Sequence, residues 1–134
     1  MKERMEWGLL GGRIILGLIM LAHGLQKLGA MEHTIAMFDK IGQPAVLAYT
    51  AAIVEAIGGA FLIAGLFVIP SAILLGLTML GAIVLAKLQM GLIGGYEFPL
   101  SLLGLSLILA FTGSRKLAIS EVINSKRKVL NSVK

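Results

Sequence analysis

Long apolar stretches alternate with short polar segments along this chain, and the pattern predicts its main elements. The apolar stretches cover about residues 8–28, 45–69, 71–88 and 97–112. A helix that crosses a bilayer needs roughly 20 mostly apolar residues, so these stretches have about the length of membrane spans. Each run is continuously apolar and does not alternate in polarity, which favours helices over the strands of a barrel. The pattern therefore predicts an all-α integral membrane four-helix bundle over residues 1–116.

Three prolines divide these stretches. Pro44 lies where the second helix is expected to begin, and Pro70 is expected to separate the second helix from the third. Pro99 lies in the expected first turn of the fourth helix, where a missing backbone N–H costs little. The ends of the fourth helix are the hardest to predict, because its apolar run is the shortest.

The last segment, residues 117–134, has a different character and is expected to be a basic cytoplasmic tail. Ser120 and Glu121 suit the start of a helix, and a broken apolar stripe lies opposite Lys126, Arg127 and Lys128. This pattern predicts an amphipathic helix on an anionic membrane surface, with a disordered basic tail as the alternative.

Composition and charge agree with a membrane protein. Hydrophobic residues make up 57% of the 134 residues and charged residues only 14%, which is far from the composition of soluble domains. Lysine and arginine gather at both ends of the chain, so the positive-inside rule predicts a multi-pass protein with both termini in the cytoplasm. Because topology accounts for the excess positive charge, no nucleic-acid partner is expected; the lipid bilayer is the expected partner.

A few ionisable residues interrupt the apolar stretches, and they are the candidate functional site. They are Arg13, His23, Lys27, Glu55 and Lys87, with Gln26 and Glu97 expected at the rim. Charge inside hydrocarbon is costly, so such groups usually pair with one another or face the interior of a bundle. At about 1.5 Å rise per residue, His23, Lys27, Glu55 and Lys87 should share the half of the bundle remote from the termini. Arg13 lies deeper toward the cytoplasm, and an ion pair between Arg13 and Glu55 is one hypothesis.

Each of these residues also has a structural interpretation. Lys27 and Lys87 lie near helix ends and could extend their amines to the headgroups. Glu55 is too deep and too short for that, so we expect it to be paired within the bundle. His23 could bond across helices or transfer protons, and Arg13 could be a structural counter-ion or a catalytic group.

Other features limit the chemistry available to the chain. The chain contains no cysteine, which excludes thiolate metal sites and a thiol relay of its own. His23 and His33 lack the spacing of a metal site, so no metal is expected. Small residues recur around Glu55 in the second stretch and predict a close helix contact, which also allows a homodimer.

Several motifs resemble those of the DoxX family, small four-helix integral membrane proteins. The resemblance rests on Gly12-Arg13-Ile14-Ile15-Leu16-Gly17-Leu18, His23-Gly24-Leu25-Gln26-Lys27-Leu28, Glu55 with Gly58-Gly59, Ala64-Gly65-Leu66, Tyr96-Glu97 and Thr112-Gly113-Ser114-Arg115. The closing segment departs from the family's common GPGR, and this departure is expected to concern only a surface turn. The resemblance implies a bacterial or archaeal cell membrane, and relatives are membrane subunits associated with thiosulfate:quinone oxidoreductase or are linked to oxidative and quinone stress.

The resemblance leaves two main hypotheses and does not decide whether the chain is an enzyme. The first is a membrane subunit of a quinone-linked oxidoreductase or oxidative-stress system, in which His23 or Lys27 donates hydrogen bonds to a quinone and Glu55 relays protons. Because no electron carrier is evident, this hypothesis requires a redox partner protein. The second is a non-catalytic scaffold or small-ligand module whose buried ion pairs fix helix packing. A proton-coupled carrier is disfavoured, because four helices enclose little path.

Overall fold

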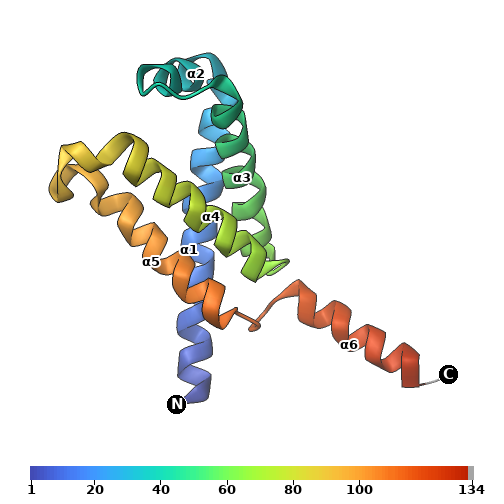
Figure 1. Ribbon diagram of the computed structural model, residues 1–134. Helices are drawn as coiled ribbons and strands as arrows, with labels where there is room; N and C mark the ends of the chain where they lie inside the picture. The colour runs from blue at the N-terminus through green and yellow to red at the C-terminus, as the bar shows by residue number, and fades with distance from the viewer. Residues whose placement is uncertain (133–134) are drawn as a thin grey trace.

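A computed structural model describes residues 1–132 of the chain, and no strand occurs among them (Figure 1). The helices are α1 (Lys2–Gly29), α2 (Met31–Lys40), α3 (Ala45–Ala64), α4 (Val68–Ala82), α5 (Glu97–Thr112) and α6 (Ile119–Ser132). Three short helical turns connect α4 to α5: η1 (Ile83–Lys87), η2 (Leu88–Met90) and η3 (Leu92–Tyr96).

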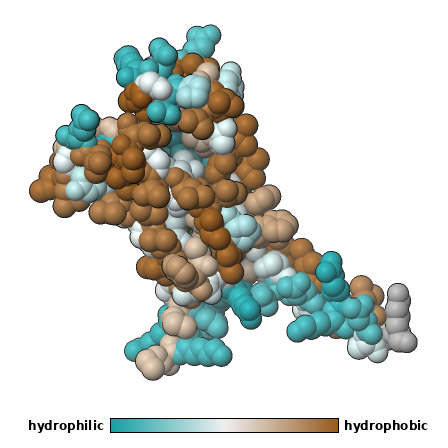
Figure 2. Space-filling model, in the orientation of Figure 1, coloured by the Kyte–Doolittle hydropathy of each residue, from teal (hydrophilic) through white to brown (hydrophobic). Residues whose placement is uncertain are grey.

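Four helical segments within residues 1–132 are long and apolar enough to cross a membrane. They are Lys2–Gly29, Ala45–Ala64, Val68–Met90 and Leu92–Thr112. Figure 2 shows hydrophobic residues around the middle of the molecule and hydrophilic residues gathered at its two ends. Such a band is what a lipid bilayer requires of the surface that faces it. The all-α membrane bundle expected from the sequence is therefore confirmed.

The break between the second and third spans lies earlier than the sequence indicated. Helix α3 ends at Ala64, not at residue 69, and Gly65 follows with a φ of 69°. Glycine adopts this left-handed conformation without the steric cost that a side chain would incur, so it ends the helix. Pro70 does not separate the two helices: it lies in the first turn of α4, which begins at Val68 and tolerates proline there.

Two other boundaries also differ from the sequence-based ranges. Helix α1 begins at Lys2, well before residue 8. The segment between the first two spans, expected to be a polar connection, contains the ten-residue helix α2. Its charged residues are exposed and its Thr34 is buried. Thr34 donates hydrogen bonds to the carbonyls of Lys27 (3.2 Å) and Ala30 (3.0 Å), which ties the start of α2 to the end of α1.

The spanning helices form two antiparallel pairs. Helix α1 packs along α3, and α4 packs along α5; Figure 1 shows the second pair crossing the first and diverging from it toward the end that carries α2. Buried apolar side chains fill the contact between the pairs, including Leu16, Met20, Leu62, Leu75 and Leu109.

Glycines bring the backbones of α1 and α3 into close contact. A Cβ atom added to Gly17 would lie 2.9 Å from the carbonyl oxygen of Gly59. One added to Gly24 would lie 2.7 Å from the Cα of Ala56. Small residues permit this approach in lipid, where van der Waals packing holds helices together. The small-residue stripe of α3 is therefore used within the chain and gives no support to the homodimer that the sequence pattern allows.

The tail contains a helix, α6, over Ile119–Ser132, so the disordered alternative does not describe these residues. Val133 and Lys134 lie outside the described residues. The division into a membrane domain at residues 1–116 and a cytoplasmic tail at residues 117–134 remains a prediction.

Candidate functional site: a buried ion pair between α1 and α3

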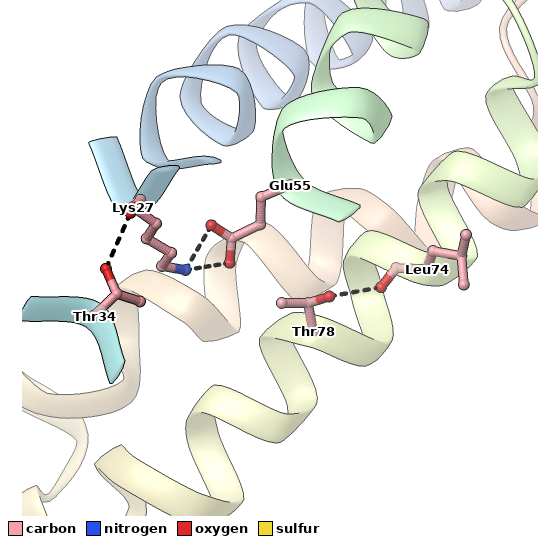
Figure 3. A network of polar contacts seen from close by, with 5 residues as sticks. All are labelled: Lys27, Thr34, Glu55, Leu74 and Thr78. Carbon is pink, nitrogen blue, oxygen red and sulfur yellow. Dashed lines mark hydrogen bonds and ion pairs between the residues drawn. The ribbon is translucent and has the colours of Figure 1, made fainter. Parts of the chain in front are cut away.

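Lys27 of α1 and Glu55 of α3 form an ion pair inside the bundle (Figure 3). The Lys27 amine lies 2.5 Å from Oε1 and 2.6 Å from Oε2 of the Glu55 carboxylate, so it donates to both oxygens. The Glu55 side chain is 1% exposed and that of Lys27 is 29% exposed. The predicted pairing of Glu55 within the bundle thus has a specific partner.

Helix packing sets the position of this pair. Gly24 and Ala56 make a close contact between the two helices. Gly24 lies one turn before Lys27 in α1, and Ala56 directly follows Glu55 in α3. With the two backbones this close, the long lysine side chain reaches across to the short carboxylate. Thr34 adds a constraint by holding the backbone carbonyl of Lys27. Thr78 of α4, also drawn in Figure 3, donates to the Leu74 carbonyl of its own helix at 3.0 Å.

The pair is electrically neutral as a unit but retains a donor. A lysine ammonium carries three N–H bonds, and within residues 1–132 only the two carboxylate oxygens accept from that of Lys27. Because Lys27 is partly exposed while Glu55 is not, any incoming acceptor would meet the amine first. The arrangement can therefore donate a hydrogen bond to a neutral acceptor while keeping its own charges balanced.

Arg13 does not join this pair, so the hypothesis of an Arg13–Glu55 ion pair is wrong. The Arg13 side chain is buried, and Nη1 donates to the Ser114 carbonyl at 3.0 Å. Nη2 donates to the Leu117 carbonyl at 3.4 Å. The physical reason is depth: Arg13 lies 14 residues before Lys27, about 21 Å along a helix, near the opposite end of the bundle.

His23 and Gln26 are on the exposed surface of α1. The imidazole of His23 lies beside the ring of Phe98, which belongs to the first turn of α5, with the ring centroids 5.7 Å apart. Within residues 1–132, neither side chain makes a hydrogen bond to Lys27 or Glu55. His23 is one turn before Lys27 and thus on the same face of α1.

Lys87 and Glu97 belong to the connection between α4 and α5. Lys87 is half-buried at the end of η1. The Glu97 carboxylate accepts a hydrogen bond from the Gly94 N–H at 2.9 Å and so stabilises the turn that leads into α5. In the part of the chain that the structure describes, neither residue forms an ion pair with the Lys27–Glu55 unit. Residues 1–132 contain no cluster of three or more histidine, cysteine, aspartate or glutamate side chains that could hold a metal.

Sequence reasoning missed four partners at these sites. Thr34 lies in a segment interpreted as a polar connection, and its pairing with α1 depends on the presence of α2. Phe98 lies within the fourth apolar stretch, where nothing in the sequence marks it as a neighbour of His23. The carbonyls of Ser114 and Leu117 carry no side-chain signal, so nothing in the sequence pointed to them as partners of Arg13.

The fold and the site together define a small helical membrane protein with a buried ion pair between two spans. The family model for DoxX matches residues 8–88, and the chain belongs to the DoxX family. It is similar to a Bacillus subtilis (strain 168) protein named "Putative oxidoreductase CatD", with 41% identity over 128 residues, which are 96% of this chain and 96% of the relative. The search of solved structures gave no match. The family resemblance noted in the sequence is thus confirmed.

Proposed function

We propose that this chain is the membrane component of a quinone-linked oxidoreductase or oxidative-stress system, with the Lys27–Glu55 unit as its ligand-binding group. The observation that carries the proposal is the unequal exposure of the pair, in which a buried carboxylate holds a partly exposed ammonium donor. The name of the B. subtilis relative supports an oxidoreductase-associated role. The quinone assignment comes from what the resemblance to the DoxX family implies, and the chemistry of the residues is compatible with it.

The residues present fit a quinone headgroup in three respects. A quinone offers carbonyl oxygens, and Lys27 keeps an N–H for such an acceptor. The exposed imidazole of His23 lies on the same helix face one turn away and offers a second polar group. The ring of Phe98 beside His23 supplies a flat apolar surface on which an aromatic headgroup can stack. A bound quinone would supply the two-electron redox chemistry, and Glu55 would hold the Lys27 amine in place.

The orientation proposed for the chain follows from the distribution of charge. The N-terminus and α6 lie at the same end of the bundle (Figure 1), where lysine and arginine gather. We assign this end to the cytoplasm of a bacterial or archaeal cell. The Lys27–Glu55 unit then lies in the outer half of the membrane. A redox partner protein belongs to the proposal, because the chain contains no cysteine to relay electrons.

Quinone retention tests this proposal. The protein is purified in nanodiscs from quinone-containing membranes, and the extracted quinone is quantified against protein. Wild-type protein is expected to retain quinone, and the double variant Lys27→Met/Glu55→Leu is expected to retain at least about tenfold less, because a hydrogen bond to a charged donor contributes about 1.5–3 kcal/mol. The double variant removes the donor without leaving an unpaired buried charge.

His33→Ala is the matched control for His23→Ala. Both histidines are exposed, but His33 belongs to α2 and is ten residues from His23. We expect His23→Ala to reduce retention and His33→Ala to leave it unchanged. Absence of quinone from the wild-type protein, or equal retention by the double variant, would contradict the proposal.

A second candidate is a non-catalytic module whose ion pair fixes helix packing. The observation that favours it is that Lys27 occupies both carboxylate oxygens of Glu55 at the closest contact of α1 with α3. Under this hypothesis the double variant loses its fold or its helix register while quinone retention is absent from the outset. Thermal unfolding in the same nanodiscs separates the two candidates.

A further inference from the structure

Helix α6 presents an apolar face that nothing in the described chain covers. Its apolar residues are Ile119, Val122, Ile123, Val129 and Leu130, and each is exposed by 46–68%. At 100° per residue they occupy an arc of about 120° on one side of the helix. Asn124, Lys128 and Asn131 lie on the opposite side. Within residues 1–132, no side chain of α6 is buried.

Charge indicates what covers this face. Residues 115–132 contain five basic side chains and one acidic one. The helix at the other end of the bundle, α2, has instead an excess of acidic side chains, with Glu32 and Asp39 against Lys40. An apolar arc on a helix that is rich in lysine and arginine is the pattern of a helix that lies in the interface of an anionic leaflet. Lys126 was expected opposite the apolar stripe, but in α6 it lies inside the apolar arc, and its long stem can carry the amine to the headgroups.

The linker between α5 and α6 is held firmly against the bundle. Arg13 donates to the carbonyls of Ser114 and Leu117, as described above. The Lys116 amine lies 3.3 Å from a Glu3 carboxylate oxygen and 4.2 Å from the centroid of the Trp7 ring.

The start of α6 is held as well. Ala118 is buried against Gly65, where a Cβ atom would lie 2.7 Å from the Ala118 side chain. The Ser120 N–H donates to the Gly65 carbonyl at 3.4 Å. The linker therefore fixes where α6 leaves the bundle and in which direction.

We propose that α6 binds anionic lipid headgroups at the end of the bundle that carries the N-terminus, and that buried Arg13 positions α6 for this contact. Figure 1 shows α6 running outward from this end, away from the spanning helices, where a leaflet surface would lie. Arginine suits the task because its planar guanidinium holds Nη1 and Nη2 in a fixed fork, so that each nitrogen can donate to a different carbonyl. Arg13 is thus a positioning residue, and its role is independent of the quinone proposal.

Accessibility of spin labels in vesicles tests the lipid contact. Because the chain has no cysteine, single variants Val122→Cys and Asn124→Cys can be labelled without background in the full-length protein. In phosphatidylcholine vesicles that contain phosphatidylglycerol, the label at 122 should be accessible to oxygen and shielded from an aqueous nickel reagent, and the label at 124 should show the reverse. In pure phosphatidylcholine this contrast should fall.

Charge removal gives the expected size of the effect. The triple variant Lys126→Gln/Arg127→Gln/Lys128→Gln should lower the ratio of bound to free α6 by at least about tenfold, since each basic residue near an anionic surface contributes about 1 kcal/mol. Lys40→Gln, at the other end of the bundle, is the control and should have no effect. Equal shielding of the label at 122 with and without phosphatidylglycerol would overturn the proposal. Exposure of both labels in both kinds of vesicle would overturn it too, and is the result that a protein partner would require.

The distance distribution between spin labels at positions 11 and 124 tests Arg13. Wild-type protein should give a narrow distribution, and both Arg13→Met and Arg13→Lys should broaden it. A second label pair at positions 40 and 92 reports on the other end of the bundle and should remain unchanged, which separates loss of positioning from unfolding. A narrow distance distribution between positions 11 and 124 in Arg13→Met would overturn the positioning role. Broadening of both label pairs would overturn it as well, because Arg13 would then stabilise the whole bundle.

Discussion

Lys27→Met is expected to lower the free energy of unfolding by about 3–5 kcal/mol, measured by SDS titration in mixed micelles, because it leaves Glu55 as an unpaired buried charge. The carboxylate of Glu55 is 1% exposed and accepts only from Lys27 within residues 1–132. It cannot reach water from its place in α3. Loss of Lys27 is therefore expected to cost more stability than loss of Glu55.

The reverse substitution should cost less. In Glu55→Gln the remaining charge belongs to Lys27, whose side chain is already 29% exposed and can extend toward the headgroups. We expect a loss of about 1–2 kcal/mol. The double variant Lys27→Met/Glu55→Leu should be within about 1 kcal/mol of wild type, because buried ion pairs are often replaced by apolar residues at no net cost. Equal losses in the two single variants would show that the pair is not buried as described. A double variant as unstable as Lys27→Met would instead support the second candidate, in which the pair fixes helix packing.

Gly24→Ala is expected to destabilise the bundle by about 3 kcal/mol, although it adds a single methyl group. The added Cβ would lie 2.7 Å from the Cα of Ala56 and closer still to its backbone nitrogen. No flexible side chain is available to move aside, so α1 and α3 must separate. That separation would also draw Lys27 away from Glu55. SDS titration measures the loss in unfolding free energy.

Gly11→Ala is the matched control on the same helix. A Cβ at Gly11 has no atom within 4 Å, and alanine favours helix over glycine by up to about 1 kcal/mol. This variant should be as stable as wild type or slightly more so. If Gly24→Ala proves as stable as Gly11→Ala, the close contact between α1 and α3 is incorrect.

Apolar runs and prolines in the sequence predicted the spanning helices, but they misplaced a helix boundary and did not predict α2. Pro70 is a strong helix breaker by composition, yet the chain turns at Gly65 and accommodates the proline in the first turn of α4. A proline is compatible with both positions, so the sequence does not distinguish them. Helix α2 was missed because ten residues form a marginal helix alone and depend on contacts such as those of Thr34.

The amino-acid sequence by itself determined that the chain is a bundle of membrane helices and that Glu55 has to be paired within it. Both conclusions follow from the cost of exposing charge and backbone polar groups to hydrocarbon, which each stretch of sequence carries on its own. The choice of Lys27 over Arg13 as the partner of Glu55 was decided by three-dimensional packing. It depends on where α1 and α3 cross, and that crossing is set by contacts such as Gly24 with Ala56 between residues far apart in the chain. Arg13 was in turn assigned to the carbonyls before α6, because hydrogen bonds to backbone groups leave no trace in side-chain patterns.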